Sequence, residues 1–350
     1  MHWLHRLQIR KCFFRCIALL VLAFPIQTWA TPFDAIYVLG DSLSDQGNIL
    51  TETTALNAFN PAVPVLPDPV HYNAGRFSNG PVYTDYLSQL LGVPLVPSLL
   101  GGTNFAFGGA RTTYNLGDSI LPGTTIPWSL NAETAAFASR GINDPNGLYI
   151  LFSGSNDLFD ILSPVPGLGP STVPTLLNGV QTAIQAFKLA GAQTILVPNV
   201  PNLGLAPAAV GNPAISAAAT NLSQQYDAQL HALLAAITGV NIIEFDTFSW
   251  LTSIVDDPAS FGLSNVTSPC YSGFILPDPT ASVCGNPDGF LFWDREHPTT
   301  VAQALLANQL FAAVVPVSEA STLPLVLAGL VFLGALRARE CRKRTRDGRH

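Results

Sequence analysis

Short apolar runs alternate along the chain with longer segments in which apolar residues recur at helical spacing. The runs are rich in β-forming residues, which is typical of buried strands. They occupy residues 34–40, 148–154, 192–201 and 240–246. The helical segments occupy residues 80–92, 173–191, 212–239 and 298–315. This alternation predicts an α/β fold, a three-layer α/β/α sandwich with a mostly parallel central sheet.

In such a sheet the active site lies beyond the carboxyl ends of the strands. The first apolar run leads into "GDSLSDQGN", which places Ser42 where a strand stops and a polar loop begins. A serine in that position could be a nucleophile or an ordinary turn residue, and this stretch alone does not decide between them.

The two ends of the chain differ from its middle. Residues 1–30 have a basic start, a short apolar stretch and a small last residue, which predicts a secretory signal peptide cleaved after Ala30; an uncleaved anchor is the alternative. Residues 316–350 combine a short apolar run with a dense basic tail, which is typical of a C-terminal sorting or membrane segment. We expect one globular domain over residues 31–315.

Charge is unevenly distributed. Of 16 basic and 23 acidic residues, 4 basic ones lie in the first 30 positions, and 7 basic and 2 acidic ones lie from residue 320 onward. The middle therefore has 5 basic and 21 acidic residues, a net charge of −16. A domain this acidic repels nucleic acid, so we expect no nucleic-acid partner.

Two of the five cysteines, Cys270 and Cys284, lie in the middle of the chain, in a stretch rich in Pro, Ser and Gly. In an exported domain such an isolated pair predicts one disulfide, with two free thiols as the alternative. The spacing of cysteines and histidines matches no metal-binding pattern, so no metal is expected.

A serine nucleophile needs a base, and the usual base is histidine. The middle of the chain offers only His71, His231 and His297. His231 falls within a predicted helix, which favours a structural role, and His71 lies in a Pro-rich loop. His297 follows Asp294 in "DREH", and a carboxylate at that spacing can hold the imidazole in the required tautomer. An incidental histidine beside a helix-start aspartate fits this motif equally well.

Two further stretches carry groups that could bind an oxyanion. Asn156 follows the second predicted strand in "FSGSNDLFD". Its amide could donate to an oxyanion or belong to an ordinary polar turn. The stretch "GGTNFAFGGAR" contains glycines whose backbone N–H groups can approach a ligand closely, although it could equally be a flexible loop.

Together, and in this order, these stretches resemble the SGNH or GDSL hydrolase family, which is named for a Ser, Gly, Asn and His in four separated blocks. The first block matches "GDSLSDQGN", the second "TNFAFGGA", the third "GSND" and the last "DREH". The stretch "GRFSNGPVYTDYL" also looks like members of this family. The resemblance covers essentially the whole middle domain and implies an SGNH-hydrolase, flavodoxin-like form of the predicted fold.

Carried onto this sequence, the resemblance implies that Ser42 is the nucleophile, His297 its base and Asp294 the residue that orients the base. We interpret Asp41 as structural. The implied reaction is acyl transfer, normally to water, through an acyl-serine ester that needs no cofactor. The sequence contains no G-x-S-x-G elbow, which argues against an α/β-hydrolase origin for the serine.

The same resemblance assigns the oxyanion hole. Its donors would be the N–H groups of Ser42 and Gly109 and the side-chain amide of Asn156, with Gly108 as the alternative to Gly109.

The leading functional hypothesis is an exported serine esterase or lipase that acts on a small-molecule or lipid ester. "FLFWDREHPTT" is more similar to the phospholipase and haemolysin branch of the family, which favours lipid esters. A carbohydrate deacetylase of the same fold is one alternative. A non-catalytic surface protein that retains the fold is another, although such a protein would be expected to lose at least one catalytic position.

The tail has a resemblance of its own. "VVPVSEASTLPLVLAGLVFLGALRARE" looks like a PEP-CTERM sorting signal, with "VSEAS" in place of the usual Pro-Glu-Pro motif. The implied partner is a sorting protease of the exosortase type, and the implied location is the cell surface or medium, with transient or permanent membrane association through the tail.

We therefore predict that the precursor pauses at the membrane and is cut near residues 317–321, because the short apolar run is followed by a basic cluster that favours a cytoplasmic C-terminus. Fractionation of cells expressing the chain with an epitope inserted after Ala30 tests this. Loss of the tail's mass from the exported form supports processing, and full-length protein in membranes supports an anchor. An intact, soluble chain with its tail attached contradicts both.

Overall fold

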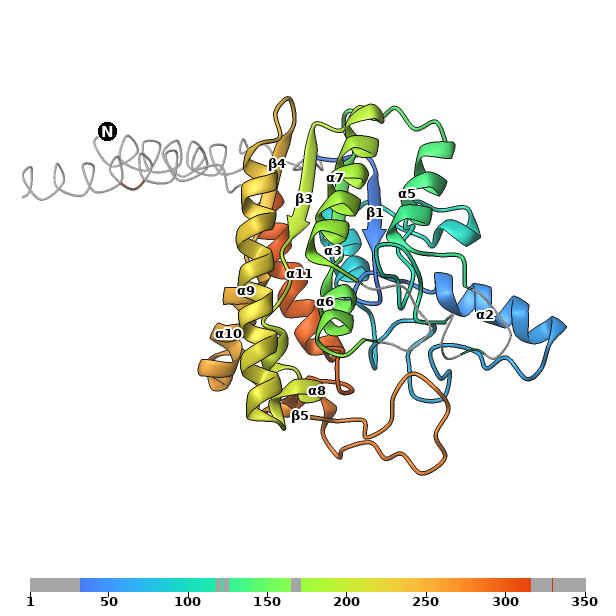
Figure 1. Ribbon diagram of the computed structural model, residues 1–350, viewed down its shortest axis with the longest axis vertical. Coiled ribbons are helices and arrows are strands. Elements are labelled where there is room, and N and C mark those ends of the chain that lie inside the picture. The colour runs from blue at the N-terminus through green and yellow to red at the C-terminus, as the bar shows by residue number, and fades with distance from the viewer. Residues whose placement is uncertain (1–31, 118–120, 122–125, 165–170, 316–328, 330–350) are drawn as a thin grey trace, which may run out of the picture. The chain divides into compact units, whose positions relative to one another are not determined.

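The computed structural model of the 350-residue chain describes residues 32–117, 121, 126–164, 171–315 and 329 (Figure 1). The predicted signal peptide and, apart from residue 329, the predicted sorting segment lie outside the described residues. Within the described ranges, no helix combines the length and the apolar character that crossing a bilayer requires.

Four parallel strands form the central sheet in the order β1–β2–β3–β4 (Figure 1). They span Ile36–Gly40, Leu148–Phe152, Thr194–Pro198 and Asn241–Phe245. β1 and β2 are buried at every position, because helices cover both faces of the sheet. Their sequences are therefore continuous apolar runs instead of alternating ones.

A short extended segment flanks β1 on its other edge. Thr103 accepts the Val38 N–H at 3.2 Å, and the Phe105 N–H donates back to the Val38 carbonyl at 2.8 Å. This pairing brings the glycine-rich stretch that follows residue 105 to the carboxyl end of β1.

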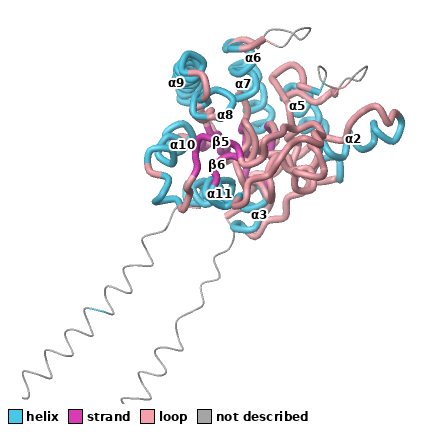
Figure 2. The backbone as a smooth tube through the Cα atoms, turned by 90° about the horizontal axis from the view of Figure 1, so that it is seen from below, coloured by secondary structure: helices cyan, strands magenta, loops and turns pink. Residues whose placement is uncertain are grey.

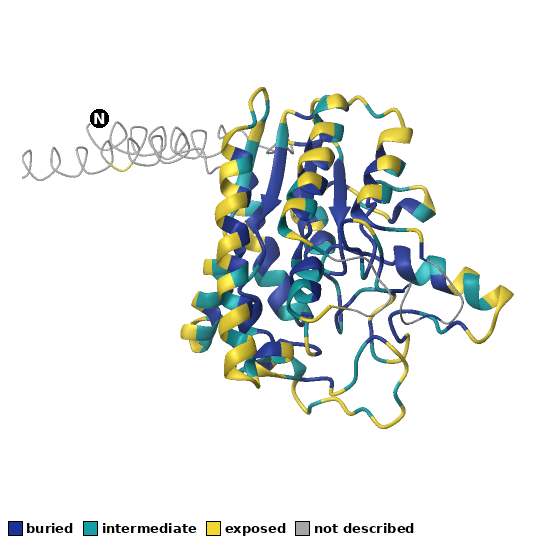
Figure 3. Cartoon of the chain, viewed as in Figure 1, coloured by how far each residue is buried: buried dark blue, intermediate teal, exposed yellow. Residues whose placement is uncertain are grey.

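Helices form a layer on each face of the sheet. Residues Tyr37 and Leu39 of β1 face one layer, and Ile36 and Val38 face the other. Figure 1 shows the first layer in front of the sheet and the second behind it, and Figure 3 shows the buried strands between helices whose outer surfaces are exposed. The front layer contains α5 (Leu130–Ser139), α7 (Val173–Leu189) and α9 (Pro213–Ala235), and the back layer contains α3 (Tyr83–Leu91) and α11 (Thr300–Val314). The predicted α/β/α sandwich is confirmed.

The helix ends follow local chemistry that is visible in the sequence. α3 ends at Gly92, which adopts the left-handed conformation that glycine tolerates best. The Asn212 side chain accepts N–H groups at the start of α9, and the Thr299 hydroxyl accepts one at the start of α11. The cap at Thr299, two residues after His297, fixes the start of α11 at Thr300.

Several elements were not predicted from the apolar pattern. α2 buries the polar residues Asn48 and Thr53 besides Ile49, so its sequence shows no apolar stripe. α6 has eight residues, too few to establish a helical period. The elements that the pattern missed, besides α5, are α2 (Asn48–Phe59), α6 (Ser155–Leu162), α8 (Pro207–Val210), α10 (Thr247–Asp256), β5 (Asn265–Pro269) and β6 (Phe290–Phe292).

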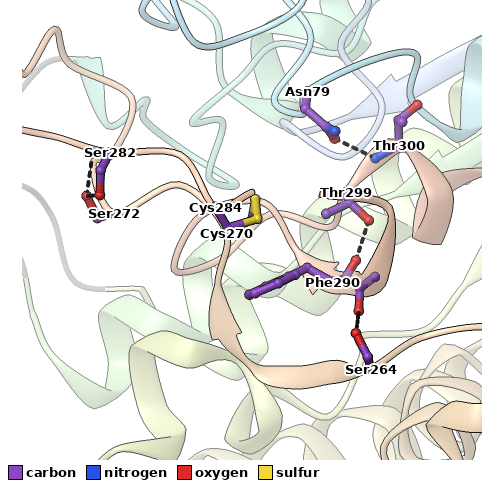
Figure 4. The surroundings of a disulfide bond; sticks show 10 residues. Asn79, Ser264, Cys270, Ser272, Ser282, Cys284, Phe290, Thr299 and Thr300 are labelled. Atoms are coloured by element: carbon purple, nitrogen blue, oxygen red, sulfur yellow. Dashed lines mark hydrogen bonds between the residues drawn. A yellow bond between two sulfur atoms is a disulfide. The ribbon is translucent and has the colours of Figure 1, made fainter. Parts of the chain in front are cut away.

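β5 and β6 pair in parallel as a second, two-stranded sheet. Figure 2 shows this sheet between α8 and α11. The chain between the two strands is closed into a loop by a disulfide between Cys270 and Cys284, which confirms the predicted pair (Figure 4).

The disulfide lies next to β6, the strand that leads towards His297. The Cys270 N–H donates to the Phe292 carbonyl at 3.0 Å. On the other side of β6, the Thr299 hydroxyl donates to the Phe290 carbonyl at 2.7 Å (Figure 4). β6 is thus held by Cys270, which directly follows β5, and by the cap of α11.

We predict that Cys270 and Cys284 resist alkylation in protein that has not been reduced, and that replacing both by serine lowers the free energy of unfolding by up to about 3 kcal/mol, because the closed loop is short. Mass spectrometry after alkylation tests the pairing, and denaturant titration tests the stability. Labelling of both thiols without reductant contradicts the disulfide.

Candidate active site

Ser42 lies directly beyond the carboxyl end of β1, in the turn that follows Gly40. A Cβ at Gly40 would lie 2.4 Å from the Phe152 carbonyl, so only glycine lets the end of β1 approach β2 this closely. The Asp41 carboxylate accepts the Leu43 N–H at 3.0 Å and so shapes the turn. The serine side chain is thereby presented at the edge of the sheet.

His297 and Asp294 lie between β6 and α11, and the structure brings both to Ser42. The distance from Ser42 Oγ to His297 Nε2 is 2.9 Å, and that from His297 Nδ1 to Asp294 Oδ2 is 2.7 Å. Because an ionised carboxylate only accepts, Nδ1 carries the proton and Nε2 is free to accept the serine hydroxyl.

All three residues are buried, with 6%, 0% and 5% exposure for Ser42, Asp294 and His297. Burial alone would raise the pKa of Asp294, but the His297 imidazole and several hydrogen bonds outweigh it and lower that pKa. Burial alone would lower the pKa of His297, but the Asp294 carboxylate outweighs it and raises that pKa. The pair therefore stabilises an imidazolium beside a carboxylate.

The other two candidate bases, His71 and His231, pair with carboxylates other than Asp294. His71 Nδ1 is 2.6 Å from Asp68 Oδ2. His231 belongs to α9, is 72% exposed in its side chain and pairs with Glu244 at 2.7 Å. Each is thus engaged by a carboxylate other than Asp294, and the contact with Ser42 is made by His297.

The structure separates the two glycine candidates. The Gly108 N–H donates to Asp45 Oδ2 at 2.8 Å and is therefore occupied. Gly109 has a φ of 79°, a conformation that favours glycine. In the described part of the chain no acceptor takes the N–H of Gly109 or that of Ser42. Gly109 is therefore the better candidate for an oxyanion donor.

Asn156 lies in the first turn of α6, which begins at Ser155 directly after the loop that follows β2. Its side-chain amide has two N–H groups. One donates to the Ala110 carbonyl at 3.0 Å, which fixes the amide next to residues 107–110, the glycine segment. The second has no acceptor within the residues that the structure describes.

Asp45, which sequence reasoning did not single out, fixes the glycine segment against the serine turn. It is fully buried, and burial raises its pKa to about 6 against the opposing effect of its hydrogen bonds. Its carboxylate accepts the backbone N–H groups of Gly47, Asn48, Ile49 and Gly108. The only signal in the sequence was its position within "GDSLSD".

Glu133 of α5 is a second buried carboxylate that sequence reasoning missed. It accepts the N–H groups of Gly40 at 3.0 Å and Phe107 at 3.2 Å, and burial raises its pKa well above the ordinary value. It therefore ties the end of β1 to the start of the glycine segment. No motif in the sequence around it indicates this contact.

A cavity opens beside Ser42 at the carboxyl ends of the strands and reaches α10. Asn156 and Glu296 contribute polar groups to it, but most of its lining is apolar. The apolar lining includes Phe152, Phe159, Leu203, Trp250, Leu251 and Leu306. Such a lining suits an apolar substrate group placed next to the serine.

Among the described residues, no group of three or more histidine, cysteine or carboxylate side chains is arranged to hold a metal ion. The polar groups nearest Ser42 are instead arranged as a proton acceptor, His297, and hydrogen-bond donors. This combination can activate a hydroxyl and stabilise an oxyanion.

The chain is similar to several known proteins. The chain is 26% identical to the phosphatidylcholine-sterol acyltransferase of Aeromonas hydrophila, over 86% of this chain and 96% of that protein. It is 28% identical to the esterase EstA of Pseudomonas aeruginosa, over 85% of this chain but 49% of EstA, so it spans about half of that protein. Axe2, an acetylxylan esterase from Geobacillus stearothermophilus, aligns with a TM-score of 0.39 and 13% identity over 80% of this chain and 92% of its own.

The sequence also matches the profile of the GDSL-like lipase/acylhydrolases, and the match extends from residue 36 to residue 310. It covers the four-stranded sheet, the helical layers up to residue 310 within α11, and every residue that the structure gathers around Ser42. The chain therefore belongs to the GDSL-like lipase/acylhydrolase family.

Proposed function

We propose that this protein is an exported serine esterase that cleaves carboxylic esters through an acyl-Ser42 intermediate. The observation that carries the proposal is the buried series of hydrogen bonds from Ser42 through His297 to Asp294. His297 takes the serine proton as Ser42 attacks the ester carbonyl, and then passes that proton to the departing alcohol. Water attacks the acyl-serine in the second half, with His297 again as the base.

The oxyanion that forms in each half is held by three donors: the N–H groups of Ser42 and Gly109 and the second N–H of the Asn156 amide. Support comes from the contacts around them, since Asp45 and Glu133 fix the glycine segment and Ala110 fixes the amide. Donors held in this way need no reorganisation when the negative charge develops.

His297 acts as a base only when it is neutral, and its pKa is raised above the ordinary value. Below that pKa the imidazolium is stabilised by Asp294 and cannot take the serine proton. We therefore expect activity to rise with pH through the pKa of His297, at pH values above about 6.5.

The apolar character of the cavity supports a proposal for the substrate class. Most of its lining is apolar, and it includes Leu203, Trp250 and Leu251 beside Ser42. We infer an acyl chain in the cavity, and therefore lipid or other acyl esters in preference to acetylated sugars. The name of the Aeromonas relative adds a second candidate, transfer of the acyl group from Ser42 to another alcohol. Export is supported by the disulfide, which is typical of oxidising compartments.

A panel of p-nitrophenyl esters of increasing chain length, phospholipids and acetylated xylo-oligosaccharides tests the substrate class in purified protein. We expect the highest kcat/KM for esters with acyl chains longer than acetyl. A preference for the acetylated sugars contradicts the lipid proposal and supports the deacetylase.

Ser42→Ala should lower kcat by roughly 10⁴-fold or more, and His297→Ala by about as much, because the two residues act as one unit. The double variant should be hardly worse than either single one. Ester turnover is the measurement, with circular dichroism to verify folding.

His71→Ala and His231→Ala are the matched controls and should keep most of the activity, because each pairs with a carboxylate away from Ser42. Retained turnover in folded Ser42→Ala, or loss of activity in His71→Ala instead of His297→Ala, contradicts the assignment.

Asn156→Ala should lower kcat by on the order of 10²- to 10³-fold with little change in KM, as expected for the loss of one oxyanion donor. Asn178→Ala, on the exposed surface of α7, is the control and should behave as wild type. An effect of Asn156→Ala on KM alone means that the amide binds the substrate and not the transition state.

A further inference from the structure

A buried tyrosine, Tyr72, contacts the far side of the Asp294 carboxylate. It lies in the loop before α3, is 3% exposed, and donates its hydroxyl to Asp294 Oδ2 at 2.5 Å. The same oxygen accepts His297 Nδ1, and Oδ1 accepts the N–H groups of Glu296 and His297 at 2.7 Å each. The carboxylate thus has four donors, of which one comes from a side chain 222 positions away in the sequence.

The phenol ring is fixed in place by three other aromatic rings. Its centroid lies 6.2 Å from that of Phe77, 5.7 Å from Tyr271 and 6.5 Å from Trp293, and all three contacts are edge-on. The Tyr72 N–H also donates to the Asp68 carbonyl at 3.0 Å. Trp293 immediately precedes Asp294, so the Tyr72 ring packs against the residue next to the one whose carboxylate its hydroxyl binds.

This arrangement fixes the orientation of the Tyr72 hydroxyl. Burial, reinforced by the neighbouring Asp294 carboxylate, raises the pKa of Tyr72, so its hydroxyl remains protonated and can only donate to Asp294. The Tyr72 hydroxyl on Oδ2 opposes rotation of the carboxylate away from His297 Nδ1. Its hydrogen bond also stabilises part of the carboxylate's negative charge, so the carboxylate attracts the imidazolium less strongly.

We propose that Tyr72 is a positioning residue for the Asp294–His297 pair, and this inference rests on the proposed serine mechanism. It touches neither Ser42 nor the cavity beside it, so its influence on the reaction passes through Asp294. Two consequences follow. The hydroxyl keeps His297 aligned with Ser42, and it limits how strongly the carboxylate stabilises the imidazolium.

Tyr72→Phe removes the hydroxyl and keeps the ring, and Tyr271→Phe is the matched control. Tyr271 is buried against both Tyr72 and Trp293, yet its hydroxyl makes no hydrogen bond to Asp294. Both substitutions therefore remove one buried hydroxyl from the same aromatic cluster, and only one of them removes a donor to the carboxylate.

For Tyr72→Phe we expect kcat to fall about tenfold with KM unchanged, because a hydrogen bond to a charged group is lost. We also expect the acid limb of kcat/KM to move to higher pH, because the carboxylate then attracts the imidazolium more strongly. The other ionisable groups around His297, Glu296 and Asp41, are unchanged in both variants. Tyr271→Phe should leave kcat and the acid limb as in wild type.

Two results overturn the inference. One is a Tyr72→Phe enzyme with wild-type kcat and acid limb, whatever its melting temperature, since a purely structural role lowers only stability. The other is an equal loss in both variants. The proton NMR resonance of His297 Nδ1–H gives a readout that needs no turnover. This resonance should shift in Tyr72→Phe and not in Tyr271→Phe. An unshifted resonance in an enzyme that still hydrolyses esters contradicts the positioning role alone. A shifted resonance in a protein that hydrolyses no ester contradicts the proposed function alone.

Discussion

The hydrogen bond between Ser42 and His297 joins two residues that are 255 positions apart, and the rest of the site depends on it. Ser42 is delivered by the end of β1, a strand buried on both faces. His297 is delivered by the segment between β6 and α11. A shift of about 1 Å in either segment would break the contact, so both ends need independent support.

That support comes mainly from buried carboxylates that accept backbone N–H groups. Asp45 and Glu133 connect the end of β1 to the glycine segment, and Asp294 accepts the N–H groups of its own loop. The middle of the chain has 5 basic and 21 acidic residues, so few of its carboxylates can pair with a cation. Backbone N–H groups donate to Asp45, Glu133 and Asp294 instead, and in doing so they fix the loops that line the site.

Much of the fold could be predicted from the sequence, because β1–β4 stand out as short apolar runs and the long helices have apolar residues at helical spacing. The blocks around Ser42, Gly109, Asn156 and His297 could be found by resemblance. The helix that carries Asn156, α6, could not be predicted, because a helix of eight residues has no readable period. The choice between Gly108 and Gly109 required the position of Asp45, which only the folded chain shows.

The residues that support the site could not be predicted either, because their contacts are formed only in the folded chain. Glu133 and Tyr72 act through atoms brought near by tertiary folding, and neither lies at a spacing that indicates its partner. Export, processing of the tail and the identity of the acyl group stay predictions from the sequence and from the shape of the cavity.

The most direct test of the central claim is to trap the acyl-enzyme. Wild-type protein mixed with a p-nitrophenyl ester and quenched in acid within milliseconds would be digested and analysed by mass spectrometry. We predict an acyl group on the peptide containing Ser42, and no adduct in Ser42→Ala. An acyl group on another residue, or rapid ester turnover with no covalent adduct at any time, would contradict Ser42 as the nucleophile.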